Sequence, residues 1–144
     1  MILMVEDSDY FLDFANNLEQ KGYDVDWVKS FSGAIYRIQK NPKSYAYDAV
    51  ILDLDMSSEG LPDEALETAK KLYSGWAFYK HVLCKIPPSY RLDLYKRTIF
   101  FTGFDATFKG KFSHEEYNEL HVIGKNEPDA LKKTCSLLRK FADN

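Results

Sequence analysis

Five residues that could take part in phosphoryl chemistry stand at or just after the ends of short apolar runs. They are Glu6 and Asp7 after ILMV, Asp53 after AVIL, Thr102 after TIFF, and Lys125 after VIG. The carboxyl ends of parallel strands meet at one edge of an open sheet, where ligands commonly bind. If the four runs are neighbouring parallel strands, the sequence predicts a single rim that carries three carboxylates, a hydroxyl and an ammonium group.

The three carboxylates indicate a site for a divalent cation. Two carboxylates about 5 Å apart repel each other by about 3 kcal/mol at an effective dielectric constant of about 20. Bringing Glu6, Asp7 and Asp53 together is therefore costly unless a cation lies among them. Mg²⁺ suits such oxygen ligands. We expect it rather than Ca²⁺, because the chain lacks the DxDxDG loop that wraps Ca²⁺.

The remaining residues suit a phosphoryl group. Lys125 offers a compact positive charge and Thr102 a hydroxyl donor, and such groups stabilise phosphoryl oxygens while charge redistributes. Asp53 is the candidate nucleophile, which would form an aspartyl phosphate. Gly103 follows Thr102 and leaves space for the phosphoryl group to enter.

Each residue also has an ordinary structural explanation. Glu6 and Asp7 could cap a following helix and favour its positive end. Thr102 is a good strand residue, and Lys125 could be solvated in front of a helix. Asp53 is harder to explain in this way, because a carboxylate that closes a nearly all-apolar strand has little structural purpose. The order of all four patches is what favours chemistry.

The apolar spacing alternates between strand and helix along the chain. Helical stripes begin at Phe11, Phe31 and Leu131, with short apolar runs between them. This alternation predicts an α/β protein with a doubly wound parallel sheet and right-handed crossovers. We expect an irregular connection over residues 86–97. After the fourth strand the helix signal is weak, although SHEE at residues 113–116 is a capping-box pattern.

Length and composition predict one domain. At 144 residues the chain can bury a core of its own. A net charge of −3 with scattered Lys and Arg argues against direct nucleic-acid binding. The lone thiols Cys84 and Cys135 fit a reducing compartment, and neither a signal peptide nor a membrane-spanning run is recognisable. We therefore expect a cytoplasmic protein without a membrane partner.

The chain resembles the response-regulator receiver domain over residues 2–141. The most telling stretches are ILMVED at residues 2–7 and YDAVILD at residues 47–53. The resemblance implies a single receiver domain over residues 1–144, with a five-stranded parallel sheet flanked by helices, a flavodoxin-like fold. It also implies a two-component phosphorelay switch with no enzymatic activity beyond self-catalysed phosphotransfer and dephosphorylation.

Site residues and partners follow from the same resemblance. The groups implied to hold Mg²⁺ are Glu6, Asp7, Asp53 and the backbone carbonyl of Asp55. Asp53 would be the phosphoacceptor, with Thr102 and Lys125 at the switch-hydroxyl and lysine positions of the family. The phosphoryl donor would be a sensor histidine kinase or a histidine phosphotransfer protein.

The chain departs from the family pattern in four places. Asn126 stands where a cis proline usually follows the lysine, Val122 where an aromatic is usual, and Ser57 where proline is common. The chain between the third and fourth strands is also longer than usual. We assign an inserted helical segment to about residues 57–74.

The inserted segment carries an apolar stripe, so we expect a docked helix that lies near the rim. The residues of the stripe are Ala65, Leu66, Ala69 and Leu72. Gly75 is expected to break this helix, and Trp76 and Tyr79 indicate another one after it. A peripheral insertion is the alternative, because insertions in surface loops cost little.

Two other functions remain open. Asp53 and Asp55 form a DxD pattern like that of haloacid-dehalogenase-type phosphatases, which would make the protein an enzyme. Such an enzyme needs further acidic residues after its lysine, and the candidates here are Glu127, Asp129 and Asp143. A pseudo-receiver that binds partners without phosphorylation is the second alternative, because a fold does not fix a function.

Aromatic residues crowd the segment after Thr102. They are Phe104, Phe108, Phe112 and Tyr117. Exposed aromatics often anchor interfaces, whereas burial in the core is the more common fate of such residues. Because Val122 replaces the usual aromatic, we expect the signal to pass through movement of residues 104–112, which are pulled when Thr102 closes on the phosphoryl group.

Overall fold

The computed structural model describes residues 1–40, 47–86, 93–103 and 105–143. Its strands form one parallel sheet in the order β2-β1-β3-β4-β5. They are β1 (Ile2–Val5), β2 (Val25–Val28), β3 (Ala49–Asp53), β4 (Thr98–Thr102) and β5 (His121–Gly124). This order is that of flavodoxin-like proteins. The predicted doubly wound α/β sheet of five parallel strands is therefore confirmed.

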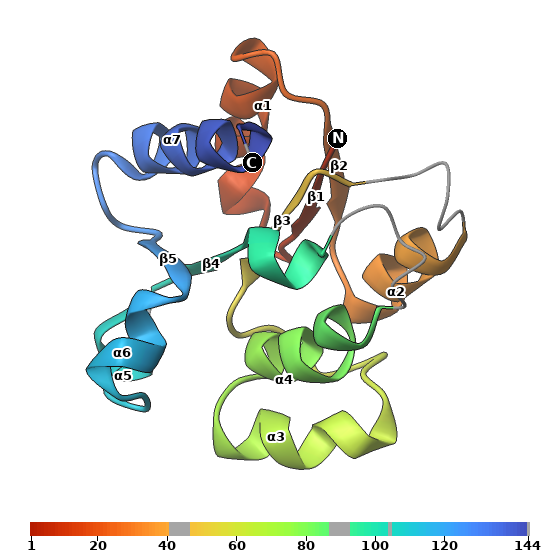
Figure 1. The fold of residues 1–144 in the computed structure, drawn as a ribbon. Helices are drawn as coiled ribbons and strands as arrows, with labels where there is room; N and C mark the ends of the chain where they lie inside the picture. Colours follow the sequence, from red (N-terminus) through yellow and green to blue (C-terminus); the bar gives the residue numbers. More distant parts are fainter. Residues whose placement is uncertain (41–46, 87–92, 104, 144) are drawn as a thin grey trace.

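Helices cover both faces of the sheet (Figure 1). The α-helices within the described residues are α1 (Leu12–Gln20), α2 (Phe31–Lys40), α3 (Leu66–Lys71), α4 (Ser74–His81), α5 (Asp105–Lys109), α6 (His114–Asn118) and α7 (Ala130–Ala142). Short 3₁₀ turns are η1 (Asp9–Phe11), η2 (Asp63–Ala65), η3 (Leu83–Lys85) and η4 (Leu94–Arg97). Because helices lie on both sides, every residue of β1, β3 and β4 is buried, which explains their nearly continuous apolar sequences.

Two hydrophobic cores lie on opposite faces of the sheet. On one face, α1 and α7 pack against alternate strand residues such as Met4 and Ile51. On the other face, α2, α4 and α5 pack against the strand residues in between, such as Leu52 and Phe100. The alternation along each strand thus places successive side chains in different cores.

The chain between β3 and β4 forms two successive helices. In Figure 1, α4 lies next to the sheet and α3 lies outside it. Of the apolar stripe, Ala65 is buried while Ala69 and Leu72 are partly buried, but Leu66 is 36% exposed. Leu66 follows the tighter 3₁₀ turn η2, which shifts it to the edge of the stripe. Thr68 Oγ1 lies 2.9 Å from His81 Nε2 and joins the two helices.

Gly75 does not end a helix, contrary to the sequence interpretation. It is the second residue of α4, whose cap Tyr73 has an extended backbone that separates α4 from α3. The expected irregular connection over residues 86–97 lies partly outside the described residues; its last part forms η4.

The segment after β4 contains two short helices. Ser113 caps α6, and Ser113 and Glu116 make both hydrogen bonds of the expected capping box. Phe108 is fully buried, whereas Phe112 and Tyr117 are partly buried against the same core. These three aromatics therefore take the core role, while Phe104 lies outside the described residues. Across the described ranges, no helix has the length and apolar character needed to cross a bilayer.

We predict that α3 and α4 resist hydrogen exchange to different degrees. Amides of α4 near Ala77 and Phe78 should be protected nearly as well as those of the strands, because these side chains are fully buried. Amides of α3 should exchange faster than those of α4, but they should remain much better protected than the amides of a random coil. Exchange followed by NMR or mass spectrometry measures this, and unprotected α3 amides would contradict a docked helix.

Candidate functional site

The sheet brings the predicted rim residues together. Glu6 follows β1, Asp53 is the last residue of β3, Thr102 is the last of β4, and Lys125 directly follows β5. The register pairs Thr102 with Gly124, so Lys125 begins next to the end of β4. Its backbone N–H donates to the Thr102 carbonyl oxygen at 2.8 Å. The short strands thus end at a common edge, as the sequence pattern predicted.

Three carboxylates gather at this edge. Glu6, Asp7 and Asp53 each offer an oxygen atom, and these three atoms lie within 4.8 Å of one another. Glu6 is 1% exposed and Asp53 5% exposed, whereas Asp7 is exposed. The cluster therefore has two buried members and one member that faces solvent, which leaves it open on one side.

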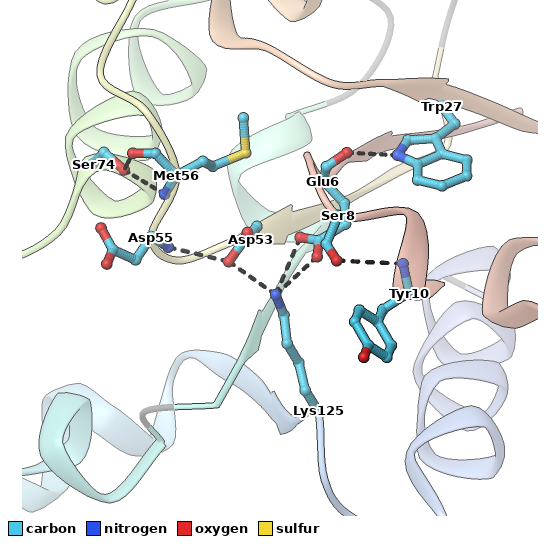
Figure 2. A network of polar contacts seen from close by, with 9 residues as sticks. All are labelled: Glu6, Ser8, Tyr10, Trp27, Asp53, Asp55, Met56, Ser74 and Lys125. Carbon is cyan, nitrogen blue, oxygen red and sulfur yellow. Dashed lines mark hydrogen bonds and ion pairs between the residues drawn. The ribbon is translucent and has the colours of Figure 1, made fainter. Parts of the chain in front are cut away.

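The ammonium group of Lys125 joins the two buried carboxylates, as Figure 2 shows. Its Nζ lies 2.9 Å and 3.2 Å from the two carboxylate oxygens of Glu6 and 3.2 Å from Asp53 Oδ1. The Lys125 side chain is itself only 16% exposed. Such a pair stabilises each buried charge, because an unpaired charge at the same depth would be strongly disfavoured.

The surroundings of the cluster favour the protonated forms of Glu6 and Asp55. Burial raises the pKa of Glu6 well above its usual range, and a hydrogen bond to Asp53 and the negative charge of Asp53 raise it further. Lys125 opposes these effects. Partial burial and the charges of Asp53 and Asp7 also raise the pKa of Asp55. Burial is the first cause of both shifts, and the neighbouring carboxylates add to it.

The loop after Asp53 is held from two directions. The Asp55 N–H donates to Asp53 Oδ1 at 3.1 Å, which orients the carboxylate. On the other side, Ser74 Oγ donates to the Met56 carbonyl at 2.7 Å and accepts from the Met56 N–H at 2.9 Å. Figure 2 shows this pair beside Asp55. The backbone that presents the Asp55 carbonyl, a predicted metal ligand, is therefore tied to the first residue of α4.

Gly75 allows that close approach. Its N–H donates to the Leu54 carbonyl at 2.8 Å. A Cβ atom at Gly75 would lie only 2.1 Å from the Asp53 carbonyl oxygen and 2.7 Å from Leu54 Cα. Only glycine fits against this backbone. Sequence reasoning recognised the glycine but read it as a helix breaker.

One further contact at the rim carried no sequence signal. Trp27 Nε1 donates to the Glu6 carbonyl oxygen at 2.7 Å and so fixes the backbone at the end of β1. Thr102 is 1% exposed, so its side chain lies within the rim rather than in solvent. Beside Lys125, the departure at Asn126 does not involve a cis bond, since the described residues contain no cis peptide.

The acidic residues after Lys125 have other partners. Glu127 Oε1 accepts from the Gly124 N–H at 3.2 Å, and its second oxygen pairs with Lys133. Asp129 lies 3.7 Å from Lys133 at the start of α7. Within the described residues, neither carboxylate belongs to the cluster of Glu6, Asp7 and Asp53.

The donor set fits a hard divalent cation. Three carboxylate oxygens lie close enough to share one ion, and Mg²⁺ is commonly held by one or two carboxylates with water and phosphate oxygens completing the shell. The exposed Asp7 provides the open side through which water or a phosphoryl group can enter. The role of Asp55 through its carbonyl stays a prediction.

Comparisons with known proteins add information about the fold. No family model matches the sequence, and a search of curated proteins found no match. Among solved structures, the chain is similar to the crystal structure of a sensor protein from Polaromonas sp. JS666, with 19% sequence identity and a TM-score of 0.58. The match covers 97% of this chain and 96% of that chain. At this identity the likeness shows a shared fold.

We predict that Mg²⁺ stabilises the protein through this cluster. At a concentration about 100 times its dissociation constant, the ion should add about 2.7 kcal/mol to the free energy of unfolding. Asp7→Asn should weaken the affinity, since it removes one clustered carboxylate. Asp13→Asn, which alters an exposed carboxylate in the first turn of α1, is the matched control. Thermal unfolding with a Mg²⁺ titration measures both.

The Lys125 ammonium should compete with the ion for Glu6 and Asp53. Lys125→Met removes this competitor, so it should bind Mg²⁺ more tightly than the parent protein does. Equal Mg²⁺ stabilisation of the parent and Asp7→Asn proteins would contradict a metal site at the cluster.

We also predict that Gly75→Ala destabilises the protein by about 1–3 kcal/mol, because the added methyl group overlaps the Asp53–Leu54 backbone. Gly110→Ala is the control, since its nearest atom would lie at an ordinary 3.5 Å. Urea unfolding compares the two. A Gly75→Ala protein as stable as the parent would show that α4 can move away from the loop without cost.

Proposed function

We propose that this protein is a phosphorylation-controlled signalling switch of the receiver type, with Asp53 as its phosphoacceptor. The observation that supports this most strongly is the arrangement of Lys125 between the buried carboxylates Glu6 and Asp53, with Asp7 completing the acidic cluster. The parallel sheet and its likeness to a sensor protein are compatible with this function.

In the proposed reaction, a carboxylate oxygen of Asp53 attacks the phosphorus of a phosphohistidine. A P–O bond forms as the P–N bond breaks, and the departing imidazole takes up a proton from water. The ammonium of Lys125 pairs with one phosphoryl oxygen, and the Thr102 hydroxyl donates to another. Mg²⁺ held by the cluster would reduce the repulsion between the incoming phosphoryl group and the carboxylates.

The proposed donor is a sensor histidine kinase or a histidine phosphotransfer protein, and the downstream effector is a protein. The chain itself would act as a switch in the cytoplasm rather than as an enzyme with a separate substrate. Its net charge of −3 supports a protein partner over direct contact with nucleic acid.

We predict that acetyl phosphate with Mg²⁺ adds one phosphoryl group to the protein, as measured by intact mass. Asp53→Asn should abolish the addition, because an amide oxygen is too weak a nucleophile. It should keep the fold, since the substitution lowers the repulsion within the cluster. Omission of Mg²⁺ should also suppress labelling. Full labelling of Asp53→Asn would show that another residue is the acceptor.

Asp55→Asn separates this function from that of a DxD phosphatase. In the receiver reaction only the backbone carbonyl of Asp55 is used, so the substitution should leave labelling largely intact. In a phosphatase reaction the exposed Asp55 carboxyl acts in catalysis, and its loss should abolish turnover of a phosphate ester.

A second candidate function is supported by one observation. Lys125 pairs with both Glu6 and Asp53 and offsets part of their negative charge, which describes a rim state in which the lysine holds the carboxylates. A pseudo-receiver would keep this state permanently and bind its partner through it. Absence of labelling by both acetyl phosphate and a phosphorylated histidine phosphotransfer protein would favour this candidate.

A further inference from the structure

Lys125 also contacts aromatic rings. Its Nζ lies 4.7 Å from the ring centroid of Phe11 and 5.7 Å from that of Phe101. Both distances fall within the range of about 6 Å over which a ring face attracts a cation. The two rings meet edge to face, with centroids 5.2 Å apart and planes inclined by 75°. We call Phe11 and Phe101 the aromatic pair.

The aromatic pair comes from the same segments as the rim residues. Phe11 ends η1, the short turn that follows the acidic residues Glu6 and Asp7. Phe101 immediately precedes Thr102 in β4 and is 1% exposed. The position of the aromatic pair is therefore fixed by the backbone that fixes the carboxylates and the hydroxyl.

The carboxylate contacts alone cannot keep Lys125 in place throughout the proposed reaction. Glu6 and Asp53 pair with its ammonium, but they are also the residues that fit a metal ion. When they turn toward a cation, the ammonium loses partners, and four rotatable bonds allow it to leave the rim. Phenyl rings do not ligate Mg²⁺, so their attraction to the ammonium persists when the carboxylates are engaged.

We propose that Phe11 is a positioning residue that, together with Phe101, holds the Lys125 ammonium over the rim so that it meets the phosphoryl group on Asp53. This inference rests on the proposed function and deepens it, because it assigns to an aromatic pair the control of the lysine. Nothing in the sequence pattern indicated this role for Phe11.

The test is a graded series at Phe11 in the full chain. Phe11→Leu keeps apolar volume but removes the ring face, so labelling by acetyl phosphate at saturating Mg²⁺ should slow by about three- to tenfold. Phe11→Trp and Phe11→Tyr should retain most of the rate. Replacement by phenylalanines with increasing fluorination keeps the shape while weakening the ring's attraction, so the rate should fall stepwise.

Phe14→Leu is the matched control. Phe14 stacks on Phe101 with centroids 4.8 Å apart, and the described cation–ring contacts of Lys125 involve Phe11 and Phe101. The Phe14→Leu protein should lose about as much thermal stability as the Phe11→Leu protein, but its labelling rate should change less than twofold. In neither variant should Mg²⁺ affinity fall below the parent value, which distinguishes loss of lysine positioning from damage to the cluster.

An NMR measurement on the unphosphorylated protein tests the contact between Lys125 and Phe11 independently of the labelling rates. The Hε–Cε signal of Lys125, assigned by its loss in Lys125→Met, should be displaced by ring currents, return toward the random-coil position in Phe11→Leu, and be displaced again in Phe11→Trp. A Lys125 signal that does not respond to Phe11, or labelling rates independent of fluorination, would overturn the inference. A responsive signal in a protein that is never labelled would instead overturn the proposed function and leave the lysine positioning intact.

Discussion

Two buried carboxylates on neighbouring strands repel each other, and the other contacts at the rim must accommodate that repulsion. Glu6 and Asp53 have lost most of their hydration, so water cannot screen them as it screens surface charges. The Lys125 ammonium, within 3.2 Å of both, supplies the opposite charge. Its loss would leave uncompensated charge at depth, which is far more costly than losing a surface pair. The position of β5, which carries Lys125, is therefore as important to the site as the acidic residues themselves.

The same burial explains the architecture after Asp53. The backbone groups of Leu54 and Met56 need partners within the protein, because both residues are buried. Here α4 provides these partners through the Gly75 N–H and the Ser74 hydroxyl. Since these contacts come from the first two residues of α4, the chain between the loop and α4 can vary in length without disturbing them. That is why α3 can lie outside α4 while the rim keeps its geometry.

Local sequence patterns predicted the elements but not all of their partners. Apolar runs and helical stripes identified the sheet, because burial on both faces imposes those patterns directly. The rim followed from topology, since parallel strands bring their carboxyl ends together. The roles of Gly75 and Phe11 could not be predicted, because each depends on a close approach between segments distant in sequence. The exposure of Leu66 was missed because a 3₁₀ turn changes the helical phase.

The packing around the rim differs from one side to another. The loop after Asp53 is tied by hydrogen bonds to α4, and a side chain at Gly75 would collide with it. Lys125 is held by carboxylates, by rings and by its own backbone bond to Thr102. At Gly103, by contrast, an added Cβ would meet nothing within 4 Å. A phosphoryl group that draws the Thr102 hydroxyl inward would therefore act next to the open space beside Gly103, where the chain leads into α5 and its buried Phe108. Phe108 packs into the core shared with α4. Movement of Phe108 would therefore change the packing on the face of the sheet that α2, α4 and α5 cover, and not on the face that α1 and α7 cover.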